Sequence, residues 1–276
     1  MKDVTQGTLI YGMRSIKYPG VMTYGIIISA ACDLAQDKID KVFYLSAIPI
    51  KEWLCSDKGF ELVTAAPALN YKNNLIKNLE KYELSWEVVQ TLSPQEFELV
   101  ATQYITKKGD RDSTLTQFDK YYRITKGNLT LEEKAEVYLS ESKATASFLG
   151  DILNGSNTHF IFIPNSAISE PMSEKQGLIV DLLELDYLPM ELIKRIAAGE
   201  IDCQIMSEAE TSVYDENFFL TEDPGFAYPM HGITSPWREY VLQHFSNCFI
   251  RIGVDNPGKN EAKGIVEALF RKEEQT

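Results

Sequence analysis

The stretch Gly25-Ile-Ile-Ile-Ser-Ala-Ala-Cys-Asp-Leu34 decides the fold, because it joins the most apolar run of the chain to a short polar turn. Residues 24–29 are rich in β-branched side chains, which predicts a buried strand. Residues 6–11 and 41–50 have the same character, and Tyr18-Pro-Gly20 separates the first two runs as a turn. Short strands at such intervals indicate a β-meander or a small barrel.

After these strands, apolar side chains recur at helical spacing. Ser93-Pro-Gln-Glu96 is a capping box with proline at the first helical position, and Thr130-Leu-Glu-Glu133 is a second capping box. Residues 107–128 are polar, charged and poor in aliphatic side chains, so we expect a long loop there. Helices are predicted over residues 70–84, from residue 93 to about residue 105, and over residues 142–153.

β-structure returns in the last part of the chain. Residues 158–163 form an apolar run that Pro164 stops, and residues 177–183 are its expected hairpin partner. Ser235-Pro236 supplies an N-cap and a first-turn proline for another helix. The remaining predictions are helices over residues 188–198, 237–250 and 260–272, and a loop over residues 211–230.

The order of these elements predicts an α+β fold. A small antiparallel β-barrel is expected to carry a helical insertion and a second, mixed α/β portion. The expected boundaries are residues 1–68 for the barrel, 69–156 for the insertion and 157–276 for the mixed portion. The first and third portions are expected to pack as one unit.

Composition limits the function classes. The chain has 276 residues, 44% hydrophobic residues and a net charge of −13, which is typical of a globular protein whose surface repels phosphate backbones. Nucleic acid is therefore disfavoured as a partner. No signal peptide and no apolar run of membrane-spanning length is present, and the four cysteines are widely spaced. We expect a cytoplasmic protein with free thiols and no membrane partner.

The turn at Cys32-Asp33 is the one site-like feature of the sequence, since it follows a rigid apolar strand. The favoured interpretation is a small buried thiol, with Asp33 accepting backbone N–H groups as a turn or helix cap. Asp33 and Asp37 disfavour a reactive thiolate at Cys32. The alternative is a catalytic set in which Cys32 is the nucleophile, His231 the base and Asp33 the group that orients it.

Three histidines are available, namely His159, His231 and His244. His231 precedes a glycine in an expected loop and is the one most able to reach a cleft. His244 and Cys248 lie four residues apart on one helix face, where zinc would need two further ligands. We interpret that pair as part of a packed amphipathic helix, and predict no metal site.

Other candidates for ligand contact are Ser29, at the end of the apolar strand, and Arg238 and Arg251, which flank the helix over residues 237–250. The two arginines could hold an acidic group. The nucleotide and hydrolase motifs GxGxxG, GxxxxGK[ST], GxSxG and HExxH are all missing, so no cofactor is predicted.

Two resemblances add to these patterns. Ser29-Ala-Ala-Cys-Asp-Leu34, Ser235-Pro-Trp-Arg-Glu239 and Arg251-Ile-Gly253 resemble a set of uncharacterised bacterial proteins with S-x-x-C-D-L, S-P-x-x-E and R-x-G motifs. That resemblance spans most of the chain and implies no settled activity.

Residues 6–50 resemble the small β-barrel of MazF/PemK-type toxins, which implies a barrel fold and an RNA-cutting ancestry. The family carries Arg before its second strand and Thr or Ser after the Pro-Ile strand. This chain has Tyr24-Gly25 and Lys51 there, so the nuclease chemistry is expected to be lost.

Three function hypotheses follow. The first is a non-catalytic binding or regulatory protein of a bacterial cytosolic system, of the conflict or defence kind, that acts through a protein partner or a small ligand. The second is a cysteine-dependent hydrolase or transferase that uses Cys32 and His231. The third is a degenerate, RNA-binding MazF-like protein. A buried Cys32 would contradict the second, and RNA binding at low salt would support the third.

Overall fold

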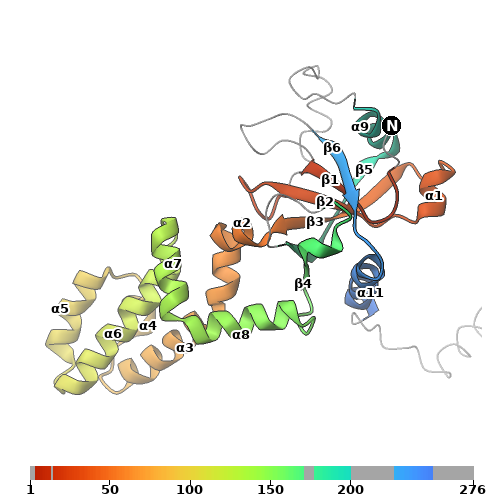
Figure 1. Ribbon diagram of the computed structural model, residues 1–276. Helices are drawn as coiled ribbons and strands as arrows, with labels where there is room; N and C mark the ends of the chain where they lie inside the picture. The colour runs from red at the N-terminus through yellow and green to blue at the C-terminus, as the bar shows by residue number, and fades with distance from the viewer. Residues whose placement is uncertain (1–3, 14, 171–176, 200–226, 251–276) are drawn as a thin grey trace, which may run out of the picture.

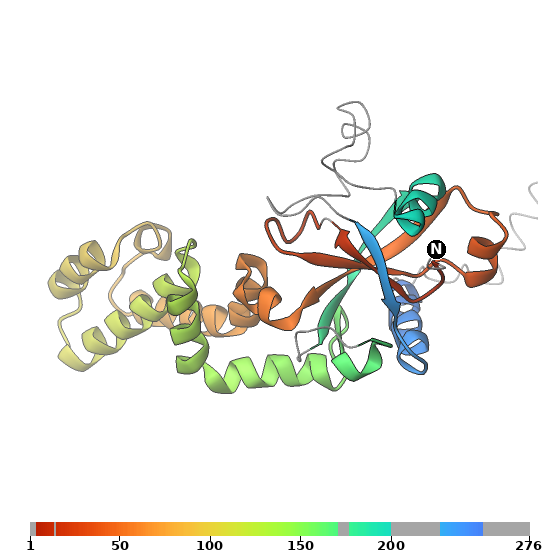
Figure 2. The ribbon, with the colours of Figure 1, turned by 45° about the horizontal axis from the view of Figure 1, so that its top comes forward.

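The protein consists of a β-sheet lobe and an elongated helical lobe that lie side by side (Figures 1 and 2). The computed structural model describes residues 4–13, 15–170, 177–199 and 227–250. The α+β class predicted from the sequence is confirmed. Within the described residues, no helix combines the length and apolar character that crossing a bilayer requires.

The described strands form one open antiparallel sheet in the order β4-β5-β3-β2-β1-β6. The predicted small barrel is therefore not found, since among the described residues its two outer strands, β4 and β6, do not pair with each other. The strands are β1 (Thr8–Met13), β2 (Thr23–Ile27), β3 (Lys41–Pro49), β4 (Phe160–Ile163), β5 (Leu178–Pro189) and β6 (Tyr228–Gly232).

Helix α11 (Trp237–Ile250) packs on one face of the sheet and α9 (Met190–Ala198) on the other (Figure 1). The helical lobe also packs on the sheet, where Trp53 and Ile152 share a core with Ile179. Alternation along the strands supplies both cores, because successive side chains of a strand point to opposite faces. Leu9 packs on the α11 side and Ile10 on the α9 side. Gly25 is required in β2, because a Cβ there would lie 2.9 Å from Met13 Cγ and 3.0 Å from Tyr44 Cδ2.

A large β-bulge interrupts the pairing of β3 with β5. Leu45 pairs with Leu185 and Ala47 with Val180, so residues 181–184 of β5 stand opposite Ser46 alone. The bulge changes the direction in which side chains of β5 point, a common effect of β-bulges. It brings two carboxyl groups, those of Asp181 and Glu184, to the turn that follows β1.

The helical lobe is built from helices with local start signals and a shared apolar core. Both predicted capping boxes, at Ser93 and at Thr130, are present. Phe97, Phe118 and neighbouring apolar side chains form a core separate from those of the sheet. The helices are α2 (Ile50–Cys55), α3 (Asp57–Glu80), α4 (Trp86–Val89), α5 (Pro94–Tyr104), α6 (Lys108–Thr125), α7 (Leu131–Ser140) and α8 (Ser142–Leu153).

One predicted loop in this lobe is wrong. Residues 107–128 contain α6, an 18-residue helix. Leu115, Phe118 and Tyr122 recur at helical spacing and pack into the lobe's core, with the Phe97 and Phe118 ring centroids 4.2 Å apart. Because aromatic side chains supply the buried stripe of α6, a count of aliphatic residues underestimates it.

The remaining predictions divide between confirmed elements and undescribed residues. The antiparallel β4–β5 pair and the helices α8, α9 and α11 are confirmed. The predicted loop over residues 211–230 is wrong at its end, since residues 228–232 form β6 along the edge of the sheet. Residues 211–226 and the expected helix over residues 260–272 lie outside the described residues.

Candidate functional site

The Cys-Asp turn lies at the start of α1 (Ala31–Ala35), a short helix that follows β2. The expectation of a buried thiol is wrong, because Cys32 is exposed. Its Sγ lies 3.5 Å from Asp33 Oδ1. Asp33 does not cap the helix either, since Ala30 is the N-cap residue and no side chain bonds to that end. The turn is therefore a surface corner, with its thiol beside a carboxylate.

The predicted partner of Cys32, His231, belongs to β6 rather than to a loop. Between β2 and β6 lies β1, which pairs with both. The side chain of His231 lies outside the described part of the structure. Within the described residues, Cys32 does not line the cavity beside α11 or three other cavities of the structure. The dyad of Cys32 and His231 stays a prediction.

The three predicted ligand-binding residues have different positions. The Ser29 hydroxyl accepts a hydrogen bond of 2.8 Å from the Phe43 backbone N–H and so ties the end of β2 to β3. The Arg238 guanidinium pairs with Glu239 at 2.7 Å, and its aliphatic stem lies against Gly7. Arg251 lies outside the described residues. The two described residues thus have structural contacts, and Ser29 and Arg238 do not meet at one cavity.

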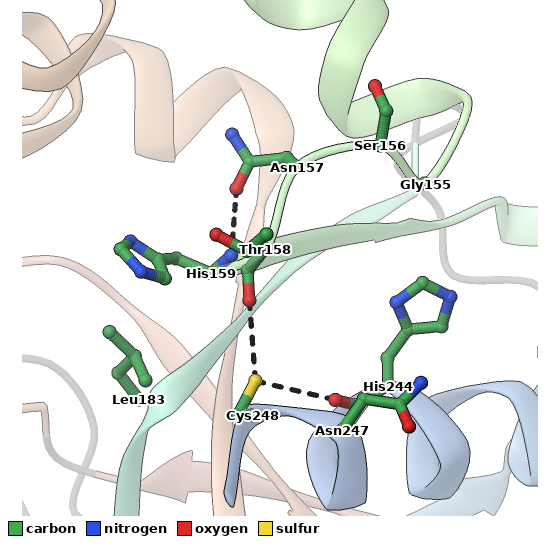
Figure 3. Close-up of a pocket in the computed structure, with 9 residues that line it drawn as sticks. All are labelled: Gly155, Ser156, Asn157, Thr158, His159, Leu183, His244, Asn247 and Cys248. Atoms are coloured by element: carbon green, nitrogen blue, oxygen red, sulfur yellow. Dashed lines mark hydrogen bonds between the residues drawn. The ribbon is translucent and has the colours of Figure 1, made fainter. Parts of the chain in front are cut away.

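A better-formed site lies where the turn between α8 and β4, the strand β5 and the helix α11 meet (Figure 3). We call this cavity, of about 290 Å³, the α11 hollow. It collects two of the chain's three histidines, together with two asparagines and a cysteine. The lining residues are Gly155, Ser156, Asn157, Thr158, His159, Leu183, His244, Asn247 and Cys248.

Local hydrogen bonds fix the turn that forms one wall of the α11 hollow. Asn157 Oδ1 accepts the backbone N–H groups of His159 and Phe160, both at 2.9 Å, which sets the start of β4. Gly155 has φ of +74° and lies so close to α11 that a Cβ would be 2.2 Å from Tyr240 Oη. Glycine is the residue that accepts both conditions.

The opposite wall is the face of α11 that carries His244 and Cys248, the two residues whose i, i+4 spacing is visible in the sequence. Cys248 Sγ lies 3.3 Å from the backbone oxygens of Thr158 and His244, and its single S–H hydrogen is shared between these two acceptors. The contact with Thr158 joins α11 to the turn across the hollow. The ring of His244 packs on Tyr240, with their centroids 4.2 Å apart. In Figure 3, His159 and His244 lie on either side of Cys248.

Burial favours the uncharged form of one imidazole in the α11 hollow, because it lowers the pKa of His244 below its ordinary value of 6.5. No lysine, arginine or carboxylate side chain lines the cavity. What remains are amide groups, hydroxyl groups, imidazole rings and the exposed apolar side chain of Leu183. Such a set can orient an uncharged ligand.

The hollow lacks the geometry of a thiol–imidazole catalyst or a metal centre. The Cys248 thiol is directed at backbone carbonyl oxygens, as its two 3.3 Å contacts show. A metal site would need three or more suitable side chains together, and the described residues contain no such group. The chemistry available in the hollow is therefore hydrogen bonding and ring stacking.

Sequence reasoning found one wall of this site and missed the other. The spacing of His244 and Cys248 placed both on one face of α11, but that pattern is equally typical of packing. The residues Asn154-Gly155-Ser156-Asn157 were visible as a turn after α8. Nothing in their spacing indicates that this turn contacts α11, a helix 80 residues further along the chain.

Comparisons with known proteins leave the function to be argued from this geometry. No protein-family profile matches the chain, and neither a curated protein nor a solved structure is significantly similar to it.

Proposed function

We propose that this chain is a non-catalytic binding protein that takes a small uncharged ligand in the α11 hollow. The observation that carries the proposal is the gathering of two histidines and two asparagines in the lining of one cavity that has no lysine, arginine, aspartate or glutamate. Ligand sites typically combine an apolar surface with a few fixed polar groups. Leu183 offers the apolar contact here. Asn247 and the side-chain NH2 group of Asn157, whose Oδ1 already accepts two backbone N–H groups, offer the polar ones.

The chemistry of the lining favours a planar heterocycle with hydrogen-bonding edges. Aromatic rings prefer to stack at centroid distances of about 4.5–7 Å, and the His244 ring is already held against Tyr240. An amide side chain has both donor and acceptor atoms for a heterocycle's edge. The volume, about 290 Å³, is at the small end of ligand sites and suits a molecule of nucleoside size.

The position of the hollow favours a regulatory role. One wall directly follows α8, the last helix of the helical lobe, and the other is α11 on the sheet (Figure 1). A ligand that touches both walls stabilises one arrangement of the two lobes, because it binds that arrangement better than others. Regulation in a bacterial cytosolic system, through a protein partner that reads this arrangement, is the role we propose.

Isothermal titration with adenosine, guanosine, cytidine and uridine tests the proposal. We expect at least one of them to bind with a Kd below about 1 mM. Asn247→Ala should weaken that binding by about tenfold, the cost of one lost hydrogen bond. Gln243→Ala is the matched control, since this exposed amide of α11 does not line the hollow. Failure of all four nucleosides to bind at millimolar concentration, or equal effects of the two variants, would contradict the proposal.

The cysteine-dependent enzyme is the alternative that one observation favours, because the Cys32 thiol is exposed and so can meet a reagent. Under the binding proposal, iodoacetamide should alkylate Cys32 before the half-buried Cys55 and Cys248, but at the rate of N-acetylcysteine. A rate at Cys32 more than about tenfold above N-acetylcysteine at pH 7 would instead support an activated nucleophile. His231→Ala should leave the rate unchanged in the first case and lower it in the second.

A further inference from the structure

A second cavity, of about 400 Å³, lies within the helical lobe and is separate from the α11 hollow. One wall is a face of α3, and the other is the end of α6 with the turn into α7. We call it the α3 groove. Its lining residues are Asp57, Phe60, Glu61, Thr64, Ala65, Ala68, Ile124, Thr125, Gly127, Asn128, Leu129 and Lys134.

Two alanines on the α3 wall keep this groove open. Phe60, Thr64 and Ala68 follow one another at i, i+4 and i+8 along α3, so they share a face. The wall ends in Ala65 and Ala68, whose methyl groups leave space that larger side chains would fill. Ile124 and Leu129 face them from the other wall. The groove is therefore an apolar recess between helices, a common place for ligand sites.

The most deeply buried charged group in the lining of the groove is the ammonium of Lys134. Its side chain is only 7% exposed, which is rare for lysine. It donates hydrogen bonds of 2.6 Å to the Cys55 backbone oxygen and 2.7 Å to Asp57 Oδ1. An ammonium group has three hydrogens, so one remains after these two bonds.

Charge around the groove decides the kind of head group it can accept. The ammonium of Lys134 is already compensated by Asp57, and the Glu61 carboxylate in the lining is paired with Lys58 at 2.7 Å. An anionic head group would therefore meet no uncompensated cation in the groove and would lose its hydration without a matching gain. An uncharged oxygen can accept the third hydrogen of Lys134 at a smaller desolvation cost.

We propose that the α3 groove binds an uncharged, apolar-chain ligand whose single oxygen acceptor bonds to Lys134, such as a medium-chain alcohol or ester. The chain lies between the alanines of α3 and the side chains of Ile124 and Leu129. This site is independent of the α11 hollow, because the two cavities share no lining residue.

The probe that tests the groove is N-phenyl-1-naphthylamine, an uncharged fluorophore that brightens in apolar sites. We expect saturable binding to the full chain and displacement by 1-decanol. Decanoate, which has the same chain length and a carboxylate head, should need at least about tenfold higher concentration. Absence of saturable fluorescence, or displacement by decanoate at the same concentration as decanol, would overturn the proposal.

Variants of α3 locate the bound probe. Ala65→Trp and Ala68→Phe place bulk in the groove and should each weaken probe binding at least about tenfold. Ala65 is already exposed, so its substitution leaves the core unaltered. Ala66→Trp is the matched control, because Ala66 is exposed on the same helix but does not line the groove. Equal binding by Ala65→Trp and Ala66→Trp would place the probe elsewhere and contradict the proposed site.

Discussion

At the scale of single residues, the most unusual environment is the carboxyl pair in the bulge of β5. Asp181 is fully buried and is bonded by the Lys17 ammonium and, at 2.9 Å, by the Tyr18 hydroxyl. Glu184 Oε1 accepts from the Ser15 hydroxyl at 2.5 Å and from the Lys17 backbone N–H at 3.2 Å. Glu184 Oε2 is buried with no hydrogen-bond partner among the described residues. The pair is thus only partly satisfied.

This environment predicts a pH-dependent stability. Burial raises the pKa of Glu184 above its ordinary 4.5. At pH values between 4.5 and this raised pKa, Glu184 is protonated in the folded protein and ionised in the unfolded chain. Ionising Glu184 then costs stability, and the free energy of unfolding falls as pH rises through the interval above 4.5. Glu184→Gln removes this cost. We expect it to raise Tm by about 2–4 °C at pH 7.5, and by less at pH 4, where wild-type Glu184 is protonated in both states.

Thermal melts of Glu184→Gln and wild type at the two pH values measure this difference. Glu98→Gln is a control, because Glu98 is exposed on α5 and its substitution should change Tm by the same small amount at both pH values. A Glu184→Gln variant that is less stable than wild type at pH 7.5 would show that the carboxylate, once ionised, is stabilising.

Two fully buried tyrosines make a matched pair. The Tyr18 hydroxyl donates to Asp181 at 2.9 Å and accepts from Trp53 Nε1 at 3.2 Å. The Tyr44 hydroxyl makes no well-formed hydrogen bond among the described residues, and its burial and the nearby Asp186 carboxyl raise its pKa. Tyr18→Phe should therefore cost about 1–3 kcal/mol, since it leaves buried partners unsatisfied. Tyr44→Phe should change stability by less than about 0.5 kcal/mol, or increase it. Urea unfolding of both variants tests this, and equal losses would contradict it.

At the scale of elements, the sequence predicted the helices and strands whose signals lie within a few neighbouring residues. The starts of α5 and α7 were predictable because each capping box lies within four residues. The strands around Gly25 were predictable from β-branched runs. The helix α6 was missed because its buried face is mostly aromatic and lies in a charged segment. The exposure of Cys32 was not predicted, because the sequence does not show whether a turn after a strand packs against the core or extends into solvent.

The capping boxes permit a quantitative test. In α5, Ser93 Oγ accepts the Glu96 N–H at 3.3 Å, and Glu96 Oε2 accepts the Ser93 N–H at 2.8 Å. Ser93→Ala should lower the free energy of unfolding by about 1 kcal/mol. Ser85→Ala is the control, because Ser85 precedes α4 without a side-chain cap bond. Denaturant melts compare them, and an equal loss in both would show that the box adds nothing at Ser93.

At the scale of the whole molecule, the pairing of strands that are far apart in the chain could not be predicted from the sequence. The central position of β3, between β2 and β5, joins strands separated by the entire helical lobe. A second long-range contact, from Cys248 of α11 to Thr158 before β4, brings the turn after α8 to α11 and forms the α11 hollow. Local patterns show the residues of such a site but not their meeting, because the pairing of distant elements depends on packing rather than on sequence spacing.

The measurement that tests the central claim most directly is NMR of the histidine ring signals during a nucleoside titration. The chain has only three histidines, two of which line the α11 hollow. The nucleoside that binds should shift the Cε1–Hε1 signals of His159 and His244 together, along one saturable curve, and leave His231 unchanged. Saturable binding that leaves both His159 and His244 unshifted would contradict the assignment of the α11 hollow as the binding site.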